Sequence, residues 1–143
     1  MKIRELLKSK PGDVVTIDVG DTIGAAARKM TAHKIAALVV TRLAHPVGVV
    51  SEQDIVAAVA EHGTQAGERP LSRLVETAIE SITPDSTLKQ AMSMMTHARL
   101  RHLPVISDDE LVGIVSLGDI VKNRLDELSL ERDVLRDIYI AAH

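Results

Sequence analysis

The amino-acid sequence predicts an α/β protein of two β-α-β-β-α repeats packed with pseudo-twofold symmetry, followed by a long C-terminal helix. The first observation is an internal repeat: residues 17–56 match residues 82–121 without a gap, with fourteen of forty positions identical. The second is that runs of Val, Ile and Leu alternate with segments rich in Ala and Met, as buried strands alternate with helices. The third is a C-terminal segment of helix-forming residues with no Gly or Pro after Gly118.

Both copies are expected to contain the same elements in the same order. Thr22 and Thr87 provide N-caps for a first helix in each copy, and Ser51 and Ser116 begin a second one. Each copy is expected to have three extended segments, of which the second and third are joined by a turn of hairpin length. They are expected at residues 14–17, 36–41 and 47–50 of the first copy and at residues 78–82, 102–106 and 111–115 of the second.

The glycines and the proline between the two copies predict a linker. Residues 71–75 echo residues 3–7, which suggests a short helical lead-in to each copy. A unit of this size is near the lower limit for a self-sufficient core, so the two copies should pack together and leave a pair of equivalent clefts. The expected divisions are residues 1–62 for repeat 1 with its lead-in, 63–72 for the linker, 73–128 for repeat 2 and 129–143 for a helical tail.

Composition excludes several classes of function. Seventeen Lys and Arg against twenty Asp and Glu give a net charge of −3, which does not suit a nucleic-acid phosphate backbone. One Tyr and no Phe or Trp leave no aromatic platform for bases, and the absence of Cys excludes disulfides and thiol catalysis. The N-terminus has no signal-peptide apolar core, and no apolar run reaches the ~20 residues of a membrane helix. A cytoplasmic protein without membrane or nucleic-acid partners is expected.

No constellation of residues predicts catalysis. The six histidines show no metal-ligand spacing, and no nucleophile–base pair, Walker loop or GxGxxG motif is present. We therefore expect neither an enzyme nor a metal site nor a cofactor.

The densest shared motif is Gly-x-Val-Ser-x-x-Asp, which places Ser51 with Asp54 and Ser116 with Asp119. Taken once, Ser followed three positions later by an acidic residue resembles a capping box that merely starts a helix. A strand that enters a helix N-terminus also offers free N–H groups to a phosphate, while the carboxylate can accept from ribose hydroxyls. Recurrence of the motif in both copies favours a paired ligand site.

With this motif, the string Arg101-His102-Leu103-Pro104-Val105 makes the chain resemble a tandem pair of CBS (cystathionine β-synthase) domains, called a Bateman module. The resemblance extends from about Ile3 to Leu128. It implies regulatory binding of an adenine-containing ligand: AMP, ADP, ATP, NAD or S-adenosylmethionine. The resemblance implies that the main chain around Thr16, Ile17, Asp18, Ser81, Ile82 and Thr83 frames the base and that Asp54 and Asp119 hold the ribose. It further implies that Ser51 and Ser116 contact ribose or phosphate and that Arg101 and His102, before Leu103 and Pro104, face phosphates.

The two copies differ where the phosphates are expected. Copy one has Ala36-Ala37 where copy two has Arg101-His102, so copy two is expected to be the better phosphate site. The favoured function is a sensor of adenine nucleotides that reports to an unidentified protein, and the alternative is a dimerisation scaffold with empty clefts.

Assembly is expected to be a homodimer. Ala-rich helices permit close helix–helix approach, and a twofold interface is the commonest closed symmetry. The tail beyond Leu128 still carries apolar residues for which the two copies provide no obvious core. The open alternative is that this tail folds back over its own module.

Overall fold

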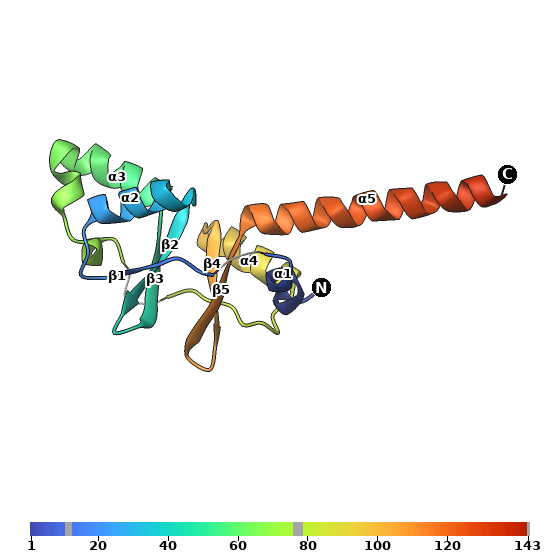
Figure 1. Ribbon diagram of the computed structural model, residues 1–143, viewed down its shortest axis with the longest axis horizontal. Coiled ribbons are helices and arrows are strands. Elements are labelled where there is room, and N and C mark those ends of the chain that lie inside the picture. Colours follow the sequence, from blue (N-terminus) through green and yellow to red (C-terminus); the bar gives the residue numbers. More distant parts are fainter. Residues whose placement is uncertain (11–12, 76–78, 143) are drawn as a thin grey trace.

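The computed structural model describes residues 1–10, 13–75 and 79–142, and shows two β-hairpins with flanking helices and one projecting helix (Figure 1). The expected order of elements is confirmed in copy one, and the described residues of copy two follow it without the first strand. Copy one contains β1 (Thr16–Asp18), α2 (Ile23–His33), β2 (Ala37–Arg42), β3 (His45–Ser51) and α3 (Glu52–His62). Copy two contains α4 (Leu88–Ala98), β4 (His102–Ser107), β5 (Glu110–Ser116) and α5 (Leu117–Ala142), and the remaining elements are α1 (Ile3–Lys8) and the 3-10 helices η1 (Gly63–Glu68) and η2 (Leu71–Arg73).

The expected N-caps are present. The Thr22 hydroxyl accepts a hydrogen bond from the backbone N–H of Ala25, and Thr87 forms a capping box with Gln90. At the opposite ends of the same helices, Lys34 and Arg99 adopt left-handed backbone conformations with φ of 54° and 56°. Equivalent residues therefore end both helices in the same way.

The strands of copy one form a sheet of order β1-β2-β3, with β1 parallel to β2 and β2 antiparallel to β3. In copy two, β4 and β5 form the equivalent antiparallel hairpin. The strand expected at residues 78–82 is reduced to a single parallel bridge between Ile82 and Val105, and Ala78 lies outside the described residues. Each hairpin turns through two residues, Leu43-Ala44 or Asp108-Asp109, all with positive φ, as type I′ turns require.

The two lead-ins are exchanged between the copies. Ile3 and Leu6 of α1 are buried in the core of copy two, together with Leu103 and Val105. In the same manner, Leu71 of η2 is buried in the core of copy one. The division that groups the N-terminal lead-in with repeat 1 follows the order of the chain, whereas in the packing α1 enters the core of copy two. A sequence echo shows that two segments are alike but not which core each one enters.

Backbone hydrogen bonds fix this exchange at both ends. The N–H of Ile3 donates to the Ser86 carbonyl at 2.8 Å, and the N–H of Leu71 donates to the Asp21 carbonyl at 2.9 Å. Each lead-in therefore joins the turn that precedes the first helix of the opposite copy. The core of copy two therefore includes a segment, α1, that is distant from it along the chain, whereas the core of copy one is completed by η2, which follows it directly.

Residues 63–72, expected as a linker, form η1 and the beginning of η2 rather than an extended connection. Ala66 and Leu71 are 1% and 0% exposed and belong to the core of copy one. The glycines of this segment permit a close approach: a Cβ at Gly24 of α2 would lie 2.9 Å from the carbonyl oxygen of Gly67. The segment is a packed part of copy one because glycine here allows two backbones to touch.

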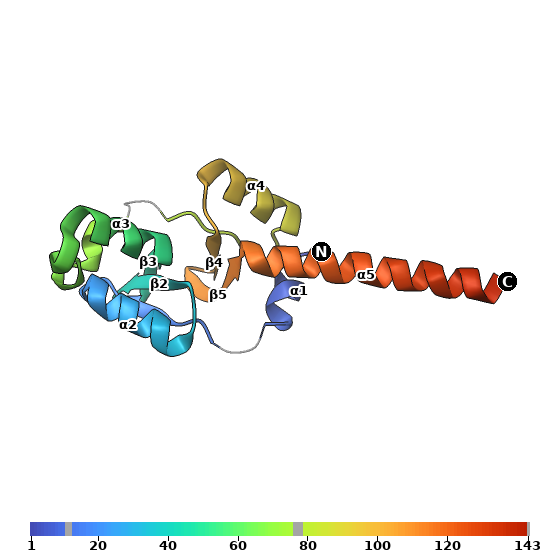
Figure 2. The ribbon, with the colours of Figure 1, turned by 90° about the horizontal axis from the view of Figure 1, so that it is seen from above.

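Helix α5 extends far beyond the rest of the molecule (Figures 1 and 2). Of its 26 residues only Ile120 is buried, and it packs into the core of copy two. The expectation of a long C-terminal helix is confirmed. The large apolar residues that this helix exposes are Leu117, Val121, Leu125, Leu128, Leu130, Val134, Leu135, Ile138, Tyr139 and Ile140.

Candidate ligand-binding clefts

Two clefts lie where the strand-to-helix junction of one copy faces the other copy. We call them the Ser51 cleft, of about 420 Å³, and the Ser116 cleft, of about 1040 Å³. Small-molecule sites in proteins are commonly on the order of 300–1,000 Å³. The pseudo-twofold relation of the copies explains why there are two such clefts, and the exchanged lead-ins line both of them through Leu74 and Leu7.

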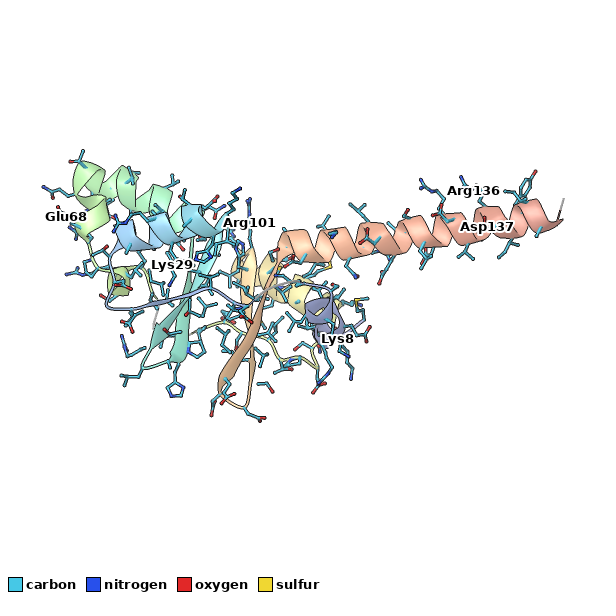
Figure 3. All side chains as sticks on the ribbon, viewed as in Figure 1. Lys8, Lys29, Glu68, Arg101, Arg136 and Asp137 are labelled. Atoms are coloured by element: carbon cyan, nitrogen blue, oxygen red, sulfur yellow. The ribbon has the colours of Figure 1, made fainter. Side chains whose placement is uncertain are left out.

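The Ser51 cleft combines residues of both copies. Ser51 and Asp54 come from copy one, and Arg101 and His102 come from the beginning of β4 in copy two. The Asp54 carboxylate accepts hydrogen bonds from the Ser51 backbone N–H at 2.8 Å and from the Ser51 hydroxyl at 3.0 Å. Arg101 is exposed and lies at the junction of the two copies (Figure 3). Glu80 and Arg99 also line this cleft, and among the described residues none of its carboxylates forms an ion pair with either guanidinium.

In each cleft a side chain of the exchanged lead-in packs directly against the glycine of the repeated motif. A Cβ at Gly48 would lie 2.6 Å from Val75 Cγ1, and a Cβ at Gly113 would lie 2.6 Å from Leu7 Cδ2. Both distances are shorter than carbon atoms tolerate. The two glycines of the repeated motif therefore allow the exchanged lead-ins to reach the cleft walls, which is a packing role that the sequence motif does not reveal.

The Ser116 cleft contains Ser116 and Asp119 of copy two with Thr16, Ala36 and Ala37 of copy one. The Asp119 carboxylate accepts from the Ser116 backbone N–H at 2.9 Å, and the Asp119 N–H donates to the Ser116 hydroxyl at 3.1 Å. The serine–aspartate geometry of the first copy is thus repeated.

One residue of the Ser116 cleft belongs to no motif in the sequence. Lys10 follows α1, and its Nζ donates to Asp119 Oδ2 and to the Ile114 carbonyl, both at 2.7 Å. Burial opposes ionisation of Asp119, but the Lys10 hydrogen bond and charge and the Ser116 bonds hold its pKa below the usual range. A lysine beside a proline and a glycine is ordinarily taken as a solvated turn residue, so only the fold reveals this contact.

The residues expected around the base divide into three groups. Thr16 lines the Ser116 cleft. Asp18 and Thr83 are exposed, the Asp18 carboxylate accepts from the Gly20 N–H at 2.7 Å, and neither residue lines a cleft; nor does Ser81. The side chains of Ile17 and Ile82 are nearly fully buried and contribute to packing. The same is true of Leu103 and Pro104, which follow the residues expected at phosphates.

Arg101 and His102, which are expected at phosphates, do not line the same set of clefts. Arg101 lines the Ser51 cleft, whereas His102 lines both clefts. Each cleft is lined by the strand-to-helix junction of one copy and by the residues just before the second strand of the other copy. For this reason Arg101, which directly precedes β4 of copy two, lies at the junction of copy one. The cation and the serine–aspartate pair of one cleft are consequently 47 to 50 positions apart along the chain.

His102 has an environment that disfavours its protonation. Burial lowers the pKa of its imidazole, the Lys10 and Arg101 charges act in the same direction, and Asp119 and Glu52 oppose them only in part. In the folded protein the imidazole therefore titrates below its ordinary value of 6.5.

This shift predicts a pH dependence of stability. As the pH falls below about 6.5, the unfolded chain takes up a proton that folded His102 resists, so the free energy of unfolding decreases. Urea unfolding at pH 7.5 and 5.5 should show a smaller decrease for His102→Gln than for wild type, because five other histidines are common to both. An equal decrease in both proteins would contradict this assignment.

Both copies share the cleft glycine, the serine–aspartate pair and an exchanged lead-in. Comparison with known proteins identifies the family to which such a repeated unit belongs. The family profile described as "CBS domain" matches twice, over residues 3–61 and 71–126. The chain belongs to the CBS domain family. The expected family and the expected fold class are both confirmed.

Relatives of this CBS pair occur in several organisms. The CBS domain-containing protein YhcV of Bacillus subtilis is 31% identical over 116 residues, which cover 81% of this chain and 82% of YhcV. The mitochondrial CBS domain-containing protein CBSX3 of Arabidopsis thaliana is 31% identical over 120 residues, and these cover 80% of this chain and 58% of CBSX3.

Solved structures share the fold. A CBS-domain protein from Agrobacterium tumefaciens is 38% identical with a TM-score of 0.82, and the match covers 87% of this chain and 99% of that one. The CBS domain pair of protein MJ0100, solved with 5′-methylthioadenosine and S-adenosyl-L-methionine, has a TM-score of 0.78 at 22% identity, covering 89% of this chain and 98% of that one. That identity carries the fold alone. Within the described residues, no helix combines the length and apolarity needed to cross a membrane, and no three metal-ligating side chains gather.

Proposed function

We propose that this CBS pair is a regulatory module that binds an adenine nucleotide in its two clefts and reports its presence to a partner protein. The observation that carries the proposal is the repeated serine–aspartate pair at a strand-to-helix junction, which faces the other copy in each cleft. A carboxylate can accept both ribose hydroxyls, and the helix N-terminus together with Arg101 suits phosphate.

The ligand would rest on aliphatic walls and not on aromatic rings. Val49, Leu74, Ile79 and Leu100 line the Ser51 cleft, and Val15, Ile35 and Val112 line the Ser116 cleft. The MJ0100 pair binds two adenosine derivatives with the same fold, which supports an adenosine moiety for this chain. Because each cleft joins both copies, a bound nucleotide would tighten the contact between them, and this provides a physical route from binding to signalling.

A thermal-shift screen with adenosine, AMP, ADP, ATP, NAD and S-adenosylmethionine tests the proposal. A ligand that binds only the folded state must raise the midpoint temperature of unfolding. At a concentration a hundred times its Kd, it adds about 2.7 kcal/mol to the free energy of unfolding. We expect at least one adenine ligand to raise the midpoint while guanosine monophosphate does not. No response to any adenine ligand would support the second candidate, a scaffold whose clefts stay empty.

The second candidate has its own supporting observation, which is the surface available for assembly. Val56 and Val59 of α3 are 68% and 51% exposed, and Ala27, Met30 and Ile55 line a hollow of about 490 Å³ beside α2 and α3. We propose that a second copy of the chain covers these helices and the apolar face of α5. Beyond Leu128, α5 carries charges of both signs, which are available for ion pairs with a second copy; these are Glu131, Arg132, Asp133, Arg136 and Asp137 (the last two in Figure 3).

Light scattering on the full chain and on a chain that ends at Leu128 tests the dimer. We expect the full chain to be a dimer and the shortened chain to form a weaker dimer, with a larger dissociation constant. The reason is that an isolated amphipathic helix gains little stability without a partner. A monomeric full chain would contradict the dimer, and an equally tight shortened dimer would show that the tail has no part in it.

A further inference from the structure

The Ser116 cleft carries its own internal cation. Lys10 Nζ lies 2.7 Å from Asp119 Oδ2, and both side chains are partly sheltered, with 31% and 25% of their surfaces exposed. A second hydrogen bond, to the Ile114 carbonyl, fixes the ammonium beside the strand-to-helix junction. Lys10 is thus bound to one oxygen, Oδ2, of the Asp119 carboxylate that the proposed function assigns to the ribose hydroxyls.

The Ser51 cleft has no such contact. Among the described residues, Asp54 has hydrogen bonds only with Ser51 and forms no ion pair. Conversely, position 36 of the Ser116 cleft is alanine where the Ser51 cleft has Arg101. Lys10 is the one lysine or arginine among the residues described as lining the Ser116 cleft, which also contains Asp13, Asp109 and Glu110.

We propose that Lys10 makes the Ser116 cleft selective for phosphorylated nucleosides over the parent nucleoside. This inference rests on the proposed function. A ribose whose two hydroxyls bind both oxygens of the Asp119 carboxylate competes with the Lys10 ammonium for Oδ2. When the ligand is an uncharged nucleoside, the ammonium is left in a partly sheltered cleft without its counter-charge. When the ligand carries phosphate, the ammonium exchanges one anionic partner for another.

The side chain of Lys10 suits this exchange. An ammonium on a flexible four-carbon stem is a point charge that can reach partners in several directions, unlike the fixed fork of a guanidinium. Charge-assisted hydrogen bonds to carboxylate and to phosphate are of similar strength, so the exchange changes the free energy little for a nucleotide. For adenosine, the same competition weakens the Lys10–Asp119 interaction, and the ligand supplies no anion in its place.

Lys10→Met tests the inference, because it removes the charge and keeps most of the stem. The measurement is calorimetric titration with adenosine and with AMP in a background in which Asp54→Asn weakens the Ser51 cleft. We expect Lys10→Met to tighten adenosine binding and to weaken AMP binding, so that the ratio of the adenosine Kd to the AMP Kd falls about tenfold or more. Lys8→Met is the matched control, since Lys8 is exposed on α1 and lines neither cleft, and it should leave the ratio unchanged.

The opposite signs for the two ligands separate selectivity from a structural role. If Lys10→Met weakens both ligands equally, or leaves both unchanged while the protein stays folded by circular dichroism, the inference is wrong and the proposed function is unaffected. If neither adenosine nor AMP binds to the wild-type chain, the proposed function fails and this inference fails with it.

Discussion

Replacement of Ile3 by alanine is expected to lower the free energy of unfolding by about 2–5 kcal/mol, the range for a large aliphatic residue that is truncated in a core. Ile3 is the third residue of the chain, yet it is 0% exposed and packs in the core of copy two. A residue so near a terminus ordinarily contributes little to stability. Urea unfolding of the full chain measures the effect.

The control for this prediction is Leu43→Ala. Leu43 is of similar size, lies at the tip of the β2–β3 hairpin and is 86% exposed, so its truncation should change stability by about 0.5 kcal/mol or less. A small effect at Ile3 would show that α1 does not complete the core of copy two. A large and equal effect at Leu43 would show that the measurement does not distinguish core from surface.

The second large effect is expected in the Ser51 cleft. Asp54→Asn removes the negative charge that would accept the ribose hydroxyls, and Arg101→Ala removes a cation from the phosphate end. With the Ser116 cleft disabled by Asp119→Asn, we expect Asp54→Asn to weaken adenosine and AMP about equally, by roughly tenfold to a hundredfold. Arg101→Ala should weaken AMP by a similar factor and leave adenosine almost unchanged.

Calorimetry with the two ligands measures this difference. Arg28→Ala is the matched control, because Arg28 is exposed on α2 and lines neither cleft. Equal losses of adenosine and AMP in Arg101→Ala would remove Arg101 from the phosphate end. An unchanged affinity in Asp54→Asn would show that the serine–aspartate pair only caps α3, which is the role that its hydrogen bonds already have without a ligand.

Most of the fold follows from local signals in the sequence. Thr22 and Thr87 mark helix starts because their hydroxyls satisfy free N–H groups, and the same chemistry occurs in both copies. The apolar runs on either side predict connections of hairpin length at residues 42–46 and 107–110, and the structure closes both with two-residue turns, at Leu43-Ala44 and Asp108-Asp109. These features depend on neighbours within a few residues, and a sequence carries that information directly.

The features that could not be predicted depend on contacts between distant residues. A buried Ile3 is compatible with either core, so its sequence does not show that α1 crosses to copy two. The same limit applies to Arg101, because its sequence position in copy two does not show that it lines the Ser51 cleft. Lys10 illustrates it most clearly, since its partner Asp119 is 109 positions away.

An NMR titration of the isotopically labelled chain with AMP tests the central claim most directly, that each cleft is built from both copies and binds a nucleotide. We predict saturable shifts of the Ser51 and Asp54 amides together with the Arg101 amide, at one common Kd, because one ligand would contact residues of copy one and copy two. Shifts confined to one copy, or no shifts at these amides at a saturating concentration of AMP, ATP or S-adenosylmethionine, would contradict the account.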